Sequence, residues 1–243
     1  VGDGGVVVAL AAEGPAALAV GGGVVAVELE GGGEVADGVG ELVALGVALA
    51  AEDEELLARL NARKAILEAR VAKQRRRVIE AIPEPRVFDG FAGSGVMHDK
   101  VWGDAQRYTG CDTRLMMDDR ITFVADNRRV LRSIDLQPFN VFDFDAYGAP
   151  WEQVLIVAAR RRVADGERIG LVITEGSGLN LQQGGIPKPL RVAAGLAGSE
   201  TGAHRLQDEI IDRAILNVAK KMACQIERRW QAKGKTGARM RYI

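Results

Sequence analysis

The stretch Val87–Gly95, VFDGFAGSG, decides the fold. A short apolar run ends in Asp89, and in the turn that follows every second or third residue is small. This order predicts a strand, a glycine turn and a helix. Because Gly93 and Gly95 lack side chains, a bound cofactor can approach the backbone of the turn closely.

The next three apolar runs along the chain also end in acids. They are Tyr108–Asp112 (YTGCD), Ile121–Asp126 (ITFVAD) and Phe139–Pro150 (FNVFDFDAYGAP), and the last carries two carboxylates beside an aromatic residue. The carboxyl ends of parallel strands meet at one edge of a sheet. Four acidic strand ends in order therefore predict one ligand crevice along that edge.

Strand-like and helix-like stretches alternate after Pro85. The apolar pattern predicts strands near 87–92, 108–112, 121–125, 139–145 and 168–174, and helices near 97–105, 127–134, 151–164 and 204–231. Alternation at this spacing predicts an α/β fold, a doubly wound, mostly parallel Rossmann-like sheet with helices on both faces. The Gly- and Gln-rich connection 176–202 is predicted to be a lid or substrate-binding loop, and the end of the chain, 239–243, an edge strand.

The chain divides by composition into three parts. Residues 1–50 form a low-complexity head of Gly, Ala, Val, Leu and acids, in which Val24–Glu30 has the pattern of a short strand. Residues 51–82 are predicted to form one long helix that stops at Pro83, and residues 83–243 the α/β domain. The helix ends in the basic run Arg70–Arg77, which suits a helix C-terminus and equally suits phosphate.

Composition excludes several classes of protein. Cys111 and Cys224 are too few for a disulfide framework and suit the cytoplasm, and two histidines make a His-based metal site improbable. There is no uninterrupted run of about 18 apolar residues and no basic start, so we expect neither a membrane span nor a secretion signal. Residues 1–60 carry eleven acids and one Arg, which leaves +9 on the remainder. That basic body favours an anionic partner such as nucleic acid, although plain solvation explains it equally well.

Residues 78–243 resemble a class I S-adenosylmethionine-dependent methyltransferase. The run DGFAGSG at 89–95 is similar to the family's first motif, whose glycine turn receives the methionine part of the cofactor. The resemblance implies that Asp112 takes the ribose hydroxyls and that Asp126 accepts from the adenine amine. The cofactor-binding residues that it implies are Asp89, Phe91, Gly93, Gly95, Asp112, Asp126, Asn127 and Asp143.

The run Asp143–Pro150, DFDAYGAP, is similar to the D-x-D-P-F-G-x-P motif of tRNA guanine N2-dimethyltransferases. More broadly, it resembles the [DN]-P-P-[FY] motif of enzymes that methylate exocyclic amines of bases. Ala146 replaces the motif's proline, and no RNA-binding domain is recognisable. The resemblance implies N-methylation of a nucleobase, with RNA slightly ahead of DNA. Asp145 would accept the hydrogen bonds of the amine, and Tyr147 would stack on the base.

Three alternatives stay open. The first is a methyltransferase of the same fold that acts on a small molecule or a protein, because a fold does not dictate its substrate. The second is a nucleotide-dependent oxidoreductase, against which the incomplete G-x-G-x-x-G speaks, since His98 stands at the third glycine. The third is a non-catalytic module that keeps the pocket, against which the intact acids speak.

Overall fold

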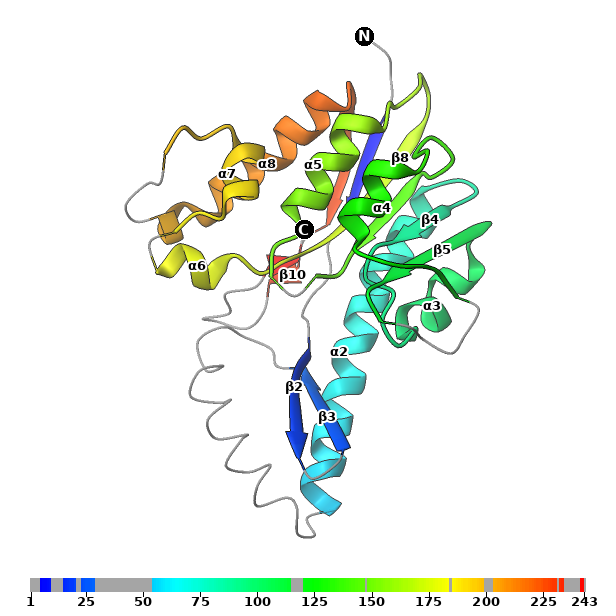
Figure 1. Cartoon of the computed structure of the whole chain (residues 1–243), viewed down its shortest axis with the longest axis vertical. Helices are drawn as coiled ribbons and strands as arrows, with labels where there is room; N and C mark the ends of the chain where they lie inside the picture. The colour runs from blue at the N-terminus through cyan, green and yellow to red at the C-terminus, as the bar shows by residue number, and fades with distance from the viewer. Residues whose placement is uncertain are drawn as a thin grey trace.

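The computed structural model describes residues 5–9, 15–20, 23–28, 54–114, 120–146, 148–183, 185–198, 203–230, 232–233 and 241–242. Its centre is a parallel sheet in the order β6-β5-β4-β7-β8 (Figure 1). The five strands are β4 (Arg86–Asp89), β5 (Arg107–Asp112), β6 (Ile121–Val124), β7 (Val141–Phe144) and β8 (Arg168–Glu175). The predicted α/β, doubly wound, Rossmann-like class is confirmed.

The register of the strands aligns their acidic ends. Asp89 of β4 lies opposite Gly110 of β5 on one side and opposite Asp143 of β7 on the other. Asp112, at the end of β5, lies opposite Val124 of β6. The strand order reverses on the two sides of β4, which is the position where open α/β sheets bind ligands.

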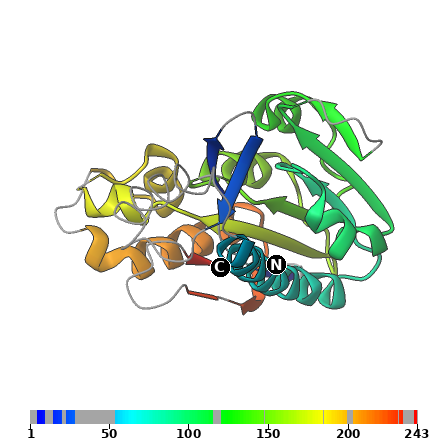
Figure 2. The ribbon, with the colours of Figure 1, turned by 90° about the horizontal axis from the view of Figure 1, so that it is seen from below.

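Helices cover the sheet on both faces (Figures 1 and 2). On one face, Leu171 and Ile173 of β8 and residues of α5 and α8 line a small apolar cavity. On the other face, a Cβ at Gly170 of β8 would lie 2.4 Å from Val78 of α2, so this helix packs closely on the sheet. The helices are α2 (Glu54–Ala81), α3 (Val96–Lys100), α4 (Asn127–Ser133), α5 (Trp151–Arg160), α6 (Gly178–Gln182), α7 (Lys188–Ala194) and α8 (Gln207–Lys221), with short 3-10 turns at Trp102–Asp104 and Ala203–Leu206.

The long helix predicted over 51–82 is confirmed by α2, which ends just before Pro83. Val71, Arg75 and Val78 are buried along one stripe of this helix. Within the described residues, no helix has both the length and the apolar composition that crossing a membrane requires.

Two predictions about the second half of the chain are wrong. The helix expected over 204–231 ends at Lys221, because Ala223 takes a left-handed conformation with φ 58° and reverses the chain into β9 (Gln225–Trp230). The connection 176–202 is not a plain loop, since it holds α6 and α7.

The ends of the chain add strands to the sheet. β1 (Gly5–Ala9) pairs in parallel with both β8 and β9, whereas β2 (Pro15–Val20) and β3 (Gly23–Glu28) form a separate antiparallel pair. The strand predicted near 239–243 is confirmed by β11 (Arg241–Tyr242), but its predicted edge position is wrong, because β11 lies between β10 (Ala232–Lys233) and the end of β8. Residues 29–50 of the head lie outside the described part of the chain.

Candidate functional site

The glycine turn, Gly90–Gly95, is tied to the strands on both sides of β4. The Gly90 N–H donates to the Asp143 carbonyl at 2.9 Å, and the Ala92 N–H donates to the Cys111 carbonyl at 3.1 Å. These two hydrogen bonds hold the start of the turn at the carboxyl edge of the sheet, which is the position that the sequence predicts.

The second half of the turn is next to Asp112. Gly93 and Gly95 adopt φ of 47° and 85°, a region that favours glycine. The Gly93 N–H donates to Asp112 Oδ2 at 2.9 Å, and the other carboxylate oxygen accepts the Arg114 N–H at 2.9 Å. A Cβ at Gly95 would lie 2.1 Å from the Arg120 guanidinium, so the side chain of Arg120 covers this glycine.

Asp89 lies at the centre of the site and is buried. Its Oδ1 accepts the Phe91 N–H at 3.0 Å, and its Oδ2 accepts the Tyr108 hydroxyl at 2.9 Å. Burial, together with the nearby charge of Asp143, raises the pKa of Asp89 to about 7. This carboxyl therefore holds a proton at pH values where an ordinary aspartate has lost it.

Asp143 is bound by two side chains from outside its own strand. Arg75 of α2 donates through Nε at 2.6 Å to Oδ2 and through Nη2 at 2.9 Å to Oδ1. The Trp102 indole N–H donates to Oδ2 at 2.8 Å. Burial alone would lower the pKa of Arg75, but the charges of Asp143 and Asp145 raise it, so the guanidinium stays charged. These contacts favour a structural role for Asp143.

Asp145 follows β7 and lies closer to solvent. Its Oδ2 accepts Arg75 Nη2 at 2.9 Å, and its Oδ1 accepts the Thr174 hydroxyl at 2.6 Å. Its side chain is 23% exposed, against 1% for Asp143. Burial and the charge of Asp143 raise the pKa of Asp145, whereas Arg75 opposes that rise. Of the two acids in DFDAYGAP, Asp145 is thus the one that a ligand can reach.

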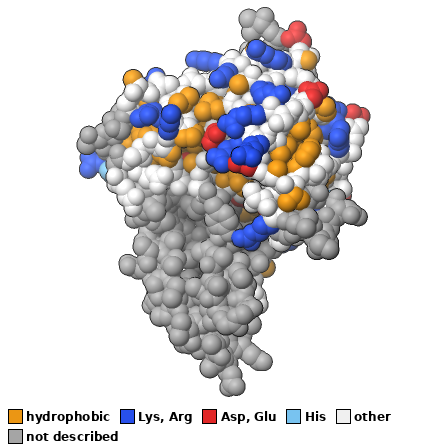
Figure 3. All heavy atoms as spheres, in the orientation of Figure 1, with side chains coloured by type: hydrophobic (Ala, Val, Ile, Leu, Met, Phe, Trp, Pro, Cys, Tyr) orange, Lys and Arg blue, Asp and Glu red, His pale blue; other side chains and the backbone are white. Residues whose placement is uncertain are grey.

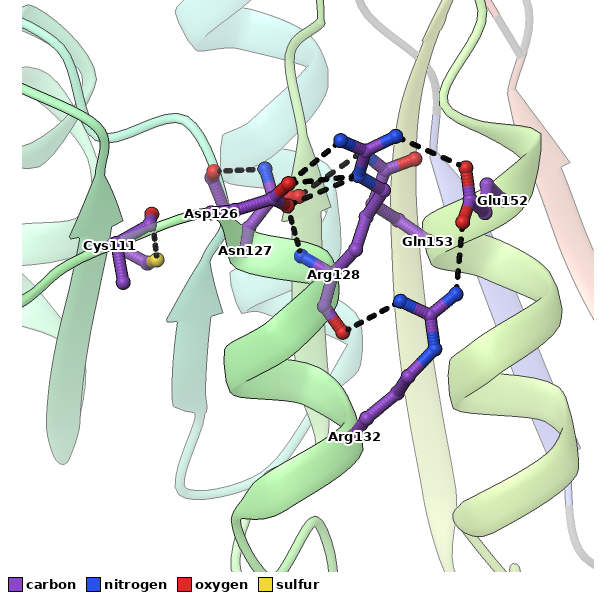
Figure 4. Close-up of polar contacts among 9 residues, drawn as sticks. Cys111, Asp126, Asn127, Arg128, Arg132, Glu152 and Gln153 are labelled. Carbon is purple, nitrogen blue, oxygen red and sulfur yellow. Dashed lines mark hydrogen bonds and ion pairs between the residues drawn. The ribbon is translucent and has the colours of Figure 1, made fainter.

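Asp126 is occupied by its own helix. It caps α4 by accepting the Arg128 N–H at 2.9 Å, and the Arg128 guanidinium also binds both of its carboxylate oxygens (Figure 4). The hydrogen bonds from Arg128 lower the pKa of Asp126 to about 2. Arg128 and Arg132 both donate to Glu152 of α5, so this cluster joins α4 to α5.

Asn127 is buried and links three segments. Its Nδ2 donates to the Gly90 carbonyl at 2.6 Å, and its Oδ1 accepts Gln153 Nε2 of α5 at 3.0 Å (Figure 4). Both polar atoms of the amide are used within the protein. Asn127 therefore connects the start of the glycine turn to α5.

The segment after Asp145 is held against the end of β8. The Gly176 N–H donates to the Gly148 carbonyl at 2.8 Å, and a Cβ at Gly176 would lie 2.8 Å from that oxygen. Ala146 is buried. Tyr147, the predicted base-stacking residue, lies outside the described residues.

The sequence did not assign Arg75, Arg120 or Thr174 to the site. One available signal was that Arg75 continues the stripe of Val71 and Val78 at steps of four and three, which puts a cation on the buried face of a helix. Arg120 and Thr174 carry no comparable signal, because only the folded chain brings them to the glycine turn and to Asp145.

The carboxylate cluster, Asp89, Asp143 and Asp145, shares the single guanidinium of Arg75. Within the described residues, no group of three His, Cys, Asp or Glu side chains has an arrangement that holds a metal ion. Even with a proton on Asp89, two carboxylates face one guanidinium, so the cluster suits a ligand with a positive charge. No family model, curated protein or solved structure matches this chain.

Proposed function

We propose that this protein is an S-adenosylmethionine-dependent N-methyltransferase that acts on an exocyclic amine of a nucleobase, in RNA ahead of DNA. The observation that carries the proposal is the position of Asp145. This half-buried carboxylate stands at the carboxyl end of β7, is fixed by Arg75 and Thr174, and retains lone pairs for further donors.

The residues of the glycine turn fit the cofactor. Among the described residues, a Cβ at Gly93 would meet only the Phe91 carbonyl, at 3.7 Å, so the absent side chain leaves room for a ligand. Asp112 keeps one lone pair on each oxygen for the ribose hydroxyls, and Arg120 has the charge and shape to bind the carboxylate of the methionine part. The acid excess of the carboxylate cluster suits the positive charge of the sulfonium and the positive charge that develops on the amine nitrogen as it accepts the methyl group.

When bound, the cofactor supplies a methyl group that is already electrophilic, so the protein's task is to position and desolvate the acceptor. Asp145 would accept an N–H of the amine and direct the nitrogen lone pair toward the methyl group. The nitrogen would gain the methyl group as the methyl–sulfur bond breaks and the sulfur keeps the electron pair, and it would lose one proton, which Asp145 would accept. The raised pKa of Asp145 supports that last role.

The predicted residues differ in their contacts, and we propose a different role for each group. We assign Asp145 to the chemistry, and Asp112, Gly93 and Asp89 to the surroundings of the cofactor. Asp143, Asp126 and Asn127 are engaged by protein partners, and we assign them to support of the site. Stacking by Tyr147 stays a prediction, with a contribution of about 1–3 kcal/mol in single-stranded recognition.

Exposed cations favour a polymeric, anionic substrate. Lys and Arg side chains gather over α4 and α5 (Figure 3). Glu152 neutralises part of this charge through Arg128 and Arg132. The exposed arginines on and beside these helices are Arg128, Arg129, Arg132, Arg160 and Arg162. Phosphate groups of a nucleic acid would bind such a surface, with an affinity that falls as salt rises.

The test is transfer of labelled methyl from S-adenosylmethionine to unmodified tRNA, unmethylated DNA and a metabolite extract. We expect label in a nucleic acid and its loss in Asp145→Ala, with unchanged transfer in the matched control Asp165→Ala, at an exposed acid. Label confined to the metabolite extract would show that the substrate is a small molecule and would overturn the proposed substrate class.

A second measurement separates chemistry from cofactor binding. S-adenosylmethionine should raise the melting temperature of the wild-type protein and of Asp145→Ala alike, because the cofactor contacts lie at the glycine turn and Asp112. NAD should have no such effect. Stabilisation by NAD alone would favour an oxidoreductase and would overturn the proposal.

A further inference from the structure

The guanidinium of Arg75 has one nitrogen that its protein partners leave unused. The side chain is 0% exposed, and its Nε and Nη2 bind Asp143 and Asp145. Among the described residues, Nη1 is buried and has no hydrogen-bond partner. A buried, charged N–H group without an acceptor is strongly unfavourable, so an acceptor is expected there when the site is filled.

The position of Nη1 follows from the shape of the guanidinium. Nη1 and Nη2 are bonded to the same carbon and share the outer edge of the plane, and the carboxylate of Asp145 binds Nη2. The free N–H of Nη1 therefore lies beside Asp145. The two side chains together offer one hydrogen-bond acceptor and one donor, next to each other.

We propose that Arg75 reads the base, by donating from Nη1 to an unprotonated ring nitrogen beside the amine that Asp145 holds. This inference rests on the proposed function and narrows its substrate class. Adenine, cytosine and guanine each carry an exocyclic amine with such a nitrogen nearby, and pairs of donors and acceptors of this kind discriminate between base edges. An aliphatic amine such as that of lysine lacks the second group.

The inference also gives α2 a part in the site. Arg75 reaches the end of β7 from a helix that precedes the sheet in the sequence, and a buried bidentate pair fixes its guanidinium plane. Lysine cannot replace this geometry, because an ammonium group has no planar fork. Arg75→Lys therefore keeps the positive charge but removes the N–H group that we propose donates to the ring nitrogen of the base.

The test compares acceptor oligonucleotides in which the ring nitrogen beside the methylated amine is replaced by C–H. The analogues are 3-deazacytosine, 3-deazaguanine, and both 1-deaza- and 7-deazaadenine, whichever matches the base that is methylated. For the wild-type protein we expect kcat/KM to fall about 10- to 100-fold with the deaza base, as for loss of one hydrogen bond to a charged group. The amine itself is present in every substrate.

Arg75→Lys completes a double-mutant cycle that removes the intrinsic effect of the base change on reactivity. In this variant, the ratio of kcat/KM for the natural substrate to that for the deaza substrate should be about 10- to 100-fold smaller than in the wild-type protein, leaving only the intrinsic effect of the base change. Arg76→Lys is the matched control, because Arg76 is exposed, donates to the Lys100 carbonyl and should leave the discrimination intact.

The outcomes separate the two proposals. Equal rates for natural and deaza substrates in the wild-type protein would overturn the role of Arg75 but would leave the proposed methyltransferase activity unchanged. This comparison uses only the wild-type protein, so it does not depend on whether a variant folds. Discrimination of the same size in Arg75→Lys as in the wild-type protein would also overturn it. Absence of transfer to any nucleobase would overturn the proposed function itself.

Discussion

At the scale of single residues, the site is a set of carboxylates whose protonation differs with their surroundings. Asp126, bound by Arg128, has a pKa of about 2, whereas Asp89, buried beside Asp143, has a pKa of about 7. Both acids stand at strand ends of the same sheet edge. The difference arises because an arginine stabilises the charged form, whereas burial disfavours it.

The raised pKa of Asp89 makes the stability of the protein depend on pH. In the unfolded chain this carboxyl ionises near pH ~4, whereas in the folded protein it keeps its proton up to about pH 7. The contribution of Asp89 to the free energy of unfolding is therefore complete below pH ~4 and is lost as the pH rises through 7. In Asp89→Asn this loss should disappear.

Urea denaturation of Asp89→Asn and of the wild-type protein at pH 5, 6, 7 and 8 measures the difference. Asp165→Asn, at an exposed acid, should follow the wild-type curve. Parallel curves for Asp89→Asn and the wild-type protein across this range would show that Asp89 ionises as an ordinary aspartate.

At the scale of elements, the end of β8 and the segment after β7 are fitted against each other. Gly176 donates to Gly148 across this contact and has no room for a side chain. Gly176→Ala should lower the free energy of unfolding by about 1–3 kcal/mol, as overpacking does, and should reduce methyl transfer by displacing the segment that carries Tyr147.

Gly198→Ala is the control for this substitution, since a Cβ at Gly198 would meet none of the described residues within 4 Å. Its free energy of unfolding, measured by urea denaturation, should be close to that of the wild-type protein. A Gly176→Ala variant as stable and as active as Gly198→Ala would mean that the contact can be relaxed.

The elements themselves were predictable where the local pattern was strong. The ends of β4, β5 and β7 were placed correctly to within three residues, because apolar runs that stop at an acid mark where a buried strand reaches the sheet edge. The end of α8 was missed since Ala223 takes the left-handed conformation that glycine normally supplies. Pro187 and Gly195 stand at the two ends of α7, and proline and glycine in these positions give the same sequence signal as a loop.

The side-chain contacts within the site were less predictable than the helices and strands that carry these residues. The acids at the strand ends could be named from the sequence, but their partners come from distant segments. Arg75 precedes Asp143 by 68 residues, and Thr174 follows Asp145 by 29. Only the folded chain shows that Asp126 is bound by Arg128 while Asp145 stays accessible.

At the scale of the whole molecule, α2 and the sheet form one core. Val78 packs against β8, and Arg75 neutralises buried acid at the end of β7. A chain that starts at residue 83 would leave Asp143 buried without its guanidinium, a defect that costs about 3–5 kcal/mol for a buried pair. We expect this chain to lose cooperative unfolding, whereas a chain that starts at residue 54 should retain it.

Thermal unfolding followed by near-ultraviolet circular dichroism compares the two truncated chains. Trp102 lies next to Arg75 on Asp143 and reports on this part of the core. Equal melting curves for the two chains would show that the α/β sheet does not depend on α2.

The position of β1 has a consequence for the order in which the protein is assembled during synthesis. Gly5 pairs with Arg168 and with Gln225, so β1 leaves the ribosome well before either of the strands that flank it in the sheet has been made. The strands β4 to β7 can pair much earlier through short crossovers. Contacts of such large sequence separation form slowly. We therefore expect β1 to dock late, between β8 and β9, into a sheet whose other strands are already paired.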